Sequence, residues 1–253
     1  MKTWFPSVGL SLLTLLTMAM SCESTKEVKD SFIEIVPEAT FGGTIEGFNN
    51  PNPINGSTDV LISELKFYLS KIRAVASDDR EYALVDYCFF DFRNPDFEKY
   101  RVKLPEGVNI KGLRVNVGLD STQNYSDPAS FNQAHPLSAA RGMYWTWATQ
   151  YRFLLIEGKA NQTSLIGSST DQGISYHPGG NHLYVEDVFL PLNLGVGNGS
   201  TRTVMLKLDV NQWFNGISGT IDPLTESNVH AAPEDQALGK RFIENFSASM
   251  RLQ

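Results

Sequence analysis

The stretch VLISELKFYLSKIRAVA, residues 60–76, decides the fold, because apolar and polar side chains alternate along much of its length. The alternation is clearest between Ile62 and Ser70, where Leu65, Phe67 and Leu69 are separated by polar or amphipathic residues. A period of two over this length indicates a half-buried β-strand and not a helix. The stretch therefore predicts a sheet with one face on the core.

Strands are also predicted on both sides of this stretch. Segment 81–92 is rich in aromatic residues and follows the turn at 77–79, so it predicts a hairpin with 60–76. Gly, Pro, Asn and Asp separate the remaining candidates. These further strands are expected at 41–48, 100–104, 109–119, 144–157, 173–177, 183–190 and 203–210.

Helical periodicity occurs at two places only. Residues 211–215 fit one turn, and in 234–252 the apolar residues Leu238, Phe242, Phe246 and Met250 recur at every fourth position. The second segment predicts an amphipathic helix that packs one stripe on the sheets. Short strands at regular spacing predict an all-β fold, an antiparallel β-sandwich or Greek-key-like barrel with a C-terminal helix.

Composition excludes several classes of protein. The chain has 253 residues, of which 42% are hydrophobic and 19% charged, enough apolar content for a core and too little charge for disorder. A formal net charge of −7 argues against a nucleic-acid partner, which requires a basic face. No second long apolar run follows the N-terminus, so a polytopic membrane protein is excluded.

The N-terminus predicts export and a lipid anchor. Lys2 precedes an uncharged run at 8–20, and the small residues at 19–21 lead into Cys22. This layout is typical of a secretory signal and resembles the lipobox of bacterial lipoproteins, in which the cysteine is acylated. We expect an envelope protein, on the periplasmic face or the outer-membrane surface, with this organisation: signal peptide 1–21, polar tether with lipidated Cys22 at 22–34, β-domain 35–253 whose folded part begins near Phe41.

The other cysteine, Cys88, lies in the apolar run ALVDYCFF. With Cys22 consumed by lipid, Cys88 has no partner for an intrachain disulfide. We expect a buried, unreactive thiol.

Histidine is rare in the chain, and no usual catalytic motif accompanies it. His135, His177, His182 and His230 all lie in predicted loops or at strand ends, and His135 and His177 are followed by proline. Imidazole suits copper and zinc, so each is a candidate ligand, although the spacing alone also fits ordinary surface histidines. No phosphate loop, nucleophile elbow or His-Glu-x-x-His pair is present, and we expect a protein that is not an enzyme.

The segment RGMYWTWATQYRFLLIEG, residues 141–158, has the densest aromatic content. In a strand, Trp145 and Trp147 would share one face, and large aromatics on one face usually pack in a core.

At this segment the chain resembles the MbnP-like copper-binding domain family, whose central motif is Gly-Met-x-Trp-x-Trp followed by Gly-Tyr and ending in Glu-Gly. Four other segments resemble motifs of the family in the same order: SELKFYLSKIRAVASDD, LRVNVGLDSTQN, HPLSAARGMYWTW and ISYHPGG. The tail KRFIENFSASM is also similar. Gln150 departs from the pattern where glycine is common, and Pro178 where Leu or Ile is usual.

The resemblance implies a copper site built from histidine nitrogens and a tryptophan that a partner di-haem peroxidase converts to kynurenine. On this basis His177 and His135 are the first-choice ligands, His182 and His230 are reserves, and Trp145 or Trp147 is the residue for modification or stacking. Nitrogen donors in a rigid, dry pocket favour Cu(I). A metal-free surface β-sandwich that binds a sugar or a peptide through the same aromatics is the alternative.

Overall fold

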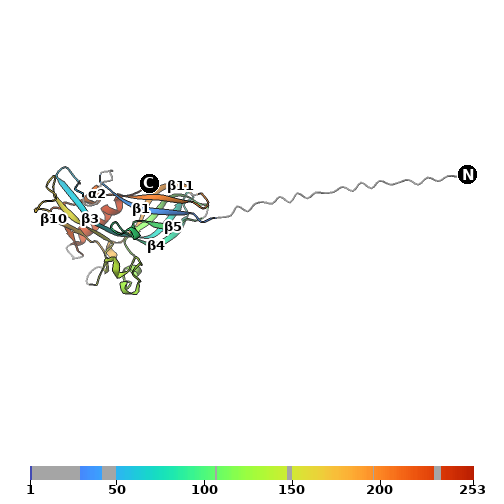
Figure 1. Cartoon of the computed structure of the whole chain (residues 1–253), viewed down its shortest axis with the longest axis horizontal. Helices are drawn as coiled ribbons and strands as arrows, with labels where there is room; N and C mark the ends of the chain where they lie inside the picture. Colours follow the sequence, from blue (N-terminus) through green and yellow to red (C-terminus); the bar gives the residue numbers. More distant parts are fainter. Residues whose placement is uncertain (2–28, 42–49, 106, 147–149, 196, 231–234) are drawn as a thin grey trace.

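The computed structural model describes Met1 and residues 29–41, 50–105, 107–146, 150–195, 197–230 and 235–253. These residues form two main sheets with a helix beside them (Figure 1). The first sheet has the order β16-β12-β1-β5, made of β16 (Met250–Leu252), β12 (Thr201–Asp209), β1 (Phe32–Thr40) and β5 (Tyr100–Lys103). The second has the order β11-β6-β3-β9-β10-β15, made of β11 (Val185–Gly195), β6 (Asn109–Val117), β3 (Thr58–Ala76), β9 (Leu154–Gln162), β10 (Gln172–Tyr176) and β15 (Asn228–Val229).

The remaining elements are short or flank these sheets. Strands β2 (Asn52–Pro53) and β4 (Glu81–Asp91) also pair with β3, so β3 is the hub of the second sheet. Two small ribbons are β7 (Tyr144–Trp145) with β8 (Gln150–Tyr151), and β13 (Asn215–Gly216) with β14 (Gly219–Thr220). The helical elements are α1 (Ser121–Asn124), α2 (Val210–Phe214), α3 (Gln236–Ser249), η1 (Pro95–Phe97), η2 (Pro128–Ser130), η3 (Ala139–Arg141) and η4 (Asn181–Leu183).

The predicted all-β sandwich with a C-terminal helix is confirmed, with two refinements. The pairs β1–β12 and β10–β15 are parallel, so the sheets are mixed and not wholly antiparallel. Both main sheets end in edge strands, so the barrel alternative is not realised. Figure 1 shows β10 at one end of the domain and β4, β5 and β11 at the other.

Strand β3 confirms that 60–76 is a strand with alternating side chains. The buried face is not the same set of positions along its whole length, however, and some residues expected to face solvent are buried. Register shifts in its pairing with β9, between Ile62 and Glu64, and in its pairing with β6, between Ser70 and Arg73, each move the buried set by one position. A bulge has this effect because its extra residue interrupts the two-residue period. Tyr68, on the expected solvent face, is fully buried because a loop covers this face. Its hydroxyl donates to Pro136 O (2.9 Å) in that loop.

The domain begins earlier than the expected start near Phe41. β1 starts at Phe32 and lies between β12 and β5, with Ile33 and Ile35 buried in the core. Residues 32–34, which were expected in the tether, therefore belong to the fold. Cys22 and most of the predicted strand at 41–48 lie outside the described residues. The predicted strand at 144–157 is split into β7, β8 and the start of β9.

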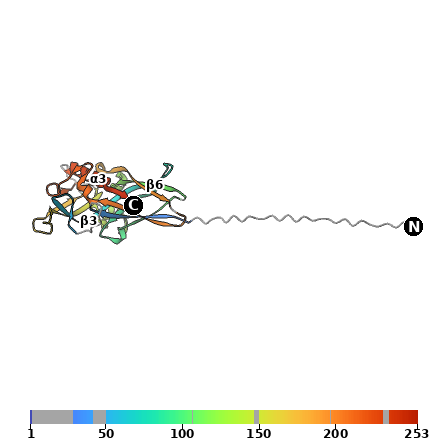
Figure 2. The ribbon, with the colours of Figure 1, turned by 90° about the horizontal axis from the view of Figure 1, so that it is seen from above.

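Helix α3 packs against strands of both sheets, β12 of the first and β11 of the second (Figure 2). It is shorter than predicted: it ends at Ser249, and Met250 instead begins β16, which pairs with β12. Phe246 packs edge-on against Phe67 of β3, with ring centres 5.5 Å apart. Phe242 stacks on Tyr176 at the end of β10, at 4.2 Å. Through this second contact the helix supports the strand that leads into His177.

Candidate metal centre

Two histidines meet because two short strands pair in parallel. Tyr176 of β10 is in register with Val229 of β15, so the next residues, His177 and His230, lie side by side at the ends of these strands. The backbone N–H of His177 donates to Val229 O (2.9 Å), which continues the ladder. The two ring centres are 5.2 Å apart.

Ser175 and Glu157 lie beside the two imidazoles. Ser175 is two residues before His177 in the chain, so both project from the same face of β10. Its Oγ lies 3.3 Å from Nε2 of His177 and 3.1 Å from Nε2 of His230. Glu157 faces Ser175 from β9, and its Oε1 is 3.1 Å from Nε2 of His177. The two Nε2 atoms thus converge on one hydroxyl, with a carboxylate at the rim.

Burial keeps His177 neutral. Desolvation first, and then electrostatic interaction with Arg152 and with the neighbouring His230, lower the pKa of His177 to about 3. The contact with Glu157 is therefore not an ion pair at neutral pH. A neutral ring has one nitrogen with a free lone pair, the form that metals bind.

One nitrogen of His177 is left without a partner. Its Nδ1 is buried and has no hydrogen bond within the part of the chain that the structure describes. Such atoms are rare in native folds. The two nitrogens of an imidazole point in different directions, so an ion at the point where the Nε2 atoms converge would leave Nδ1 to carry the ring proton. The donor chemistry of the pair fits copper, because imidazole nitrogens suit this metal.

Trp145 completes the cluster. Its ring meets His177 edge-on at 5.3 Å between ring centres and stacks on His230 at 6.0 Å with an interplanar angle of 26°. It is half-buried and is not a core residue, contrary to what the aromatic segment suggested. Trp147 lies outside the described residues. Within the residues described, no group of three or more His, Cys, Asp or Glu side chains is placed to hold a metal, so the protein donors here are two imidazoles with an indole beside them.

The other two candidate histidines lie elsewhere. His135 stacks on Phe131 at 4.1 Å, and its Nε2 lies 3.2 Å from the Tyr87 hydroxyl, while its Nδ1 accepts from the Leu137 N–H at 3.1 Å. Both of its ring nitrogens are thus engaged, and these contacts include neither His177 nor Trp145. His182 is exposed on η4. The structure therefore brings together His177 and the reserve His230, and does not bring His135 to them.

Cys88 is fully buried, as expected, and burial raises the pKa of its thiol well above the ordinary value. It lies on β4 with its side chain in the hydrophobic core, and it is not one of the residues around the histidine pair.

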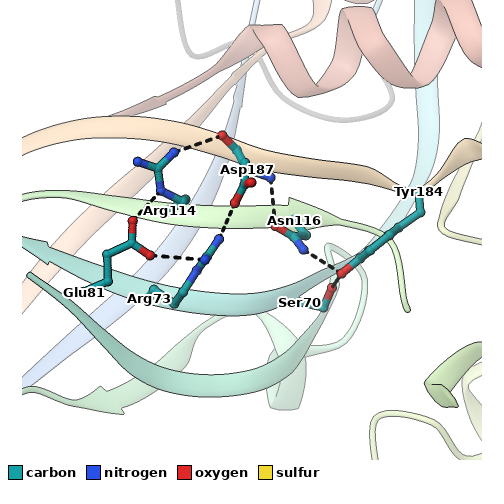
Figure 3. Close-up of polar contacts among 7 residues, drawn as sticks. All are labelled: Ser70, Arg73, Glu81, Arg114, Asn116, Tyr184 and Asp187. Atoms are coloured by element: carbon teal, nitrogen blue, oxygen red, sulfur yellow. Dashed lines mark hydrogen bonds and ion pairs between the residues drawn. The ribbon is translucent and has the colours of Figure 1, made fainter. Parts of the chain in front are cut away.

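A second polar cluster, on β3, β6 and β11, is structural (Figure 3). Glu81 accepts from Arg114 Nε (2.8 Å) and pairs with Arg73 Nη1 (3.1 Å). Asp187, whose φ is +61°, lies in the register shift of β11 and receives Arg73 on its carboxylate. The opposite charges neutralise one another and fix the irregular stretch of β11. The seven residues of the cluster are Ser70, Arg73, Glu81, Arg114, Asn116, Tyr184 and Asp187.

Known proteins share this fold. The fold and the cluster define a β-sandwich protein that carries two histidines and a tryptophan at one edge of its larger sheet. The MbnP family model matches residues 31–230, and the chain belongs to the MbnP family. The fold is similar to that of MbnP from Methylosinus trichosporium, with a TM-score of 0.51 and 16% sequence identity, over 83% of this chain and 88% of that chain. No curated protein matches the chain.

Proposed function

We propose that this chain is a copper-binding protein of the cell envelope, held to a membrane by a lipid and without enzymatic activity. The observation that carries the proposal is the convergence of His177 and His230 on one point beside Trp145. Membership of the MbnP family supports a role connected with copper.

His177 and His230 would hold the metal through their imidazole nitrogens. The family resemblance adds Trp145 as the residue that a di-haem peroxidase would oxidise to kynurenine, which would provide a further donor. The neutral state of His177 and the absence of a thiol ligand among the described neighbours favour copper held by nitrogen.

Copper content tests this proposal directly. The mature protein, stripped with a chelator and reloaded with Cu(I) under reducing conditions, should retain about one copper per chain. His177→Ala should lose it. Wild-type protein that retains no stoichiometric copper would refute the proposal.

The metal-free alternative gives the opposite results. A sugar- or peptide-binding surface would use Trp145 with an open face, whereas its ring already contacts two imidazoles and the Arg152 guanidinium. Binding of an oligosaccharide that Trp145→Ala abolishes and His177→Ala preserves would favour the alternative.

The membrane anchor is part of the proposal and is tested separately. No helix in the described part of the chain is long and apolar enough to cross a bilayer. Anchoring would depend on acylated Cys22, because two or three acyl chains attach a protein stably. Cys22→Ala should move the protein from the membrane fraction to the soluble fraction without unfolding it. A variant that stays in the membrane pellet would show that the domain binds the membrane by its own surface.

A further inference from the structure

Arg152 places a buried positive charge beside the histidine pair. Its side chain is 9% exposed, and its Cζ lies 4.5 Å from the centre of the Trp145 ring. The backbone holds it in place, since its N–H donates to Met143 O (2.7 Å) and it pairs with Gly179 in an isolated bridge. Trp145 in turn contacts both imidazoles. The guanidinium is therefore a fixed part of the wall of the site.

The charges around Arg152 leave the site with a positive bias. Two carboxylates, Glu157 and Glu64, interact with it electrostatically. Glu64 is also paired with Lys66 (2.7 Å) and Arg93 (3.6 Å), so its charge is shared among three cations. Glu157 has 44% of its side chain exposed, and solvent screens its charge more than that of buried Arg152.

We propose that Arg152 determines the charge preference of this site, favouring a singly charged metal ion over divalent ions at His177 and His230. The inference rests on the proposed copper function and specifies which ion the site selects. At any separation, the repulsion between the guanidinium and a bound ion is twice as large for a divalent ion as for a monovalent one. Arginine suits this role because it remains charged when buried.

Glu157 should act in the opposite direction. Its Oε1 lies 3.1 Å from Nε2 of His177, so the carboxylate lies close to the same metal position. A negative charge there stabilises a divalent ion more than a monovalent one. Removing Glu157 and removing Arg152 should therefore change the ion preference with opposite signs.

The test compares the one-electron reduction potential of the copper-loaded protein in four forms: wild type, Arg152→Gln, Arg152→Lys and Glu157→Gln. Arg152→Gln should favour Cu(II) over Cu(I) about tenfold more than wild type does, which lowers the potential by about 59 mV. Glu157→Gln should raise it by a similar amount. Arg152→Lys keeps the charge and should remain near wild type. Competition between Cu(I) and Zn²⁺ gives a second readout, in which Arg152→Gln should gain zinc affinity.

Opposite signs separate a charge effect from damage to the site, because damage would move both glutamine variants in the same direction. Shifts of equal sign, or Arg152→Lys behaving like Arg152→Gln, would overturn the inference. If Arg152→Gln fails to fold, the reduction potential of Glu157→Gln tests the inference. A potential for Glu157→Gln that is equal to or lower than that of wild type refutes the charge model. Stoichiometric copper in wild type with unaltered potentials in the variants refutes only this inference, whereas wild type without copper refutes the proposed function as well.

Discussion

Gln150 takes a backbone conformation that suits glycine. Its φ is +65°, in the left-handed region, at the start of the short β8 strand between Trp145 and Arg152. This conformation costs a residue with a side chain about 1 kcal/mol relative to glycine. Glycine is common in the family at this position. Gln150 replaces it here and is therefore a strained residue. Its side chain has a compensating contact, because the Tyr144 hydroxyl donates to Gln150 Oε1 at 2.7 Å.

Two substitutions at this position isolate the backbone cost. Gln150→Gly and Gln150→Ala both remove the contact with Tyr144, so they differ mainly in the conformational preference of the backbone. Gln150→Gly should be the more stable of the two by about 1 kcal/mol in urea unfolding. Equal stability, or a more stable alanine variant, would mean that the left-handed conformation is not a constraint.

His177 should make the stability of the apoprotein depend on pH. Its pKa is about 3 in the fold, against about 6.5 in the unfolded chain, so between these values the unfolded chain binds a proton that the native state does not. The free energy of unfolding should therefore fall as pH is lowered through this range, by up to roughly 1.4 kcal/mol per pH unit from this group. The measurement is urea unfolding with a chelator present, at several pH values between about 6 and 4.

His177→Gln provides the comparison for that titration, since glutamine does not titrate. The difference in stability between wild type and variant should shrink or reverse toward acid pH. Curves that stay parallel across this range would contradict the assignment of a neutral, desolvated imidazole.

At the scale of elements, the bulge of β3 and the glycine opposite it form one unit. Gly158 pairs with Ile62 at the register shift, and a Cβ built on Gly158 would lie 2.0 Å from Leu61 O. A backbone oxygen cannot move aside cheaply, so the strand must shift to accept a side chain. This close approach gives a physical reason for the glycine at position 158.

Gly158→Ala should accordingly destabilise the protein by about 1–3 kcal/mol. Gly173→Ala is the matched control, because Gly173 lies on neighbouring β10 with nothing within 4 Å of its hypothetical Cβ. The control should change the urea midpoint little or raise it slightly. Similar losses in the two variants would show that the effect is general to glycine in these strands.

The elements that could be predicted from sequence are the ones with sustained local patterns. The two-residue period of β3 and the four-residue period of α3 both correspond to observed elements, because side-chain burial directly reports the repeat of each structure. The bulges of β3 and the end of α3 at Ser249 were not predictable, since each depends on pairing with a distant strand. β15 was missed because a two-residue strand has no period to detect.

The same limit explains the candidate site. The sequence ranks His177 and His135 ahead of His230, because the first two lie in segments that resemble motifs of the family and His230 does not. The pairing of His177 with His230 depends on the parallel register of β10 and β15, a long-range property. Glu157, Ser175 and Arg152 carry no signal of their own in the sequence. Glu157 and Ser175 come together with the histidine pair only through the pairing of β10 with β9 and β15, which the sequence alone does not show.

Across the whole molecule, the four histidines are distributed unevenly, and only His177 and His230 are placed as the proposed metal site. In the structure His135 is held by Phe131, Tyr87 and the Leu137 backbone, away from this pair, and His182 is an exposed residue of η4. The two sheets therefore separate the four histidines into one pair and two single residues, and copper affinity should follow this division.

The most direct measurement is the Cu(I) affinity of His230→Ala set against that of His135→Ala, in purified protein with a competing chelator. His230→Ala should weaken binding by at least about tenfold, because loss of even an indirect partner of a metal ligand costs this much. His135→Ala should retain the wild-type affinity and about one copper per chain. The reverse result, with copper lost in His135→Ala and kept in His230→Ala, would contradict the account.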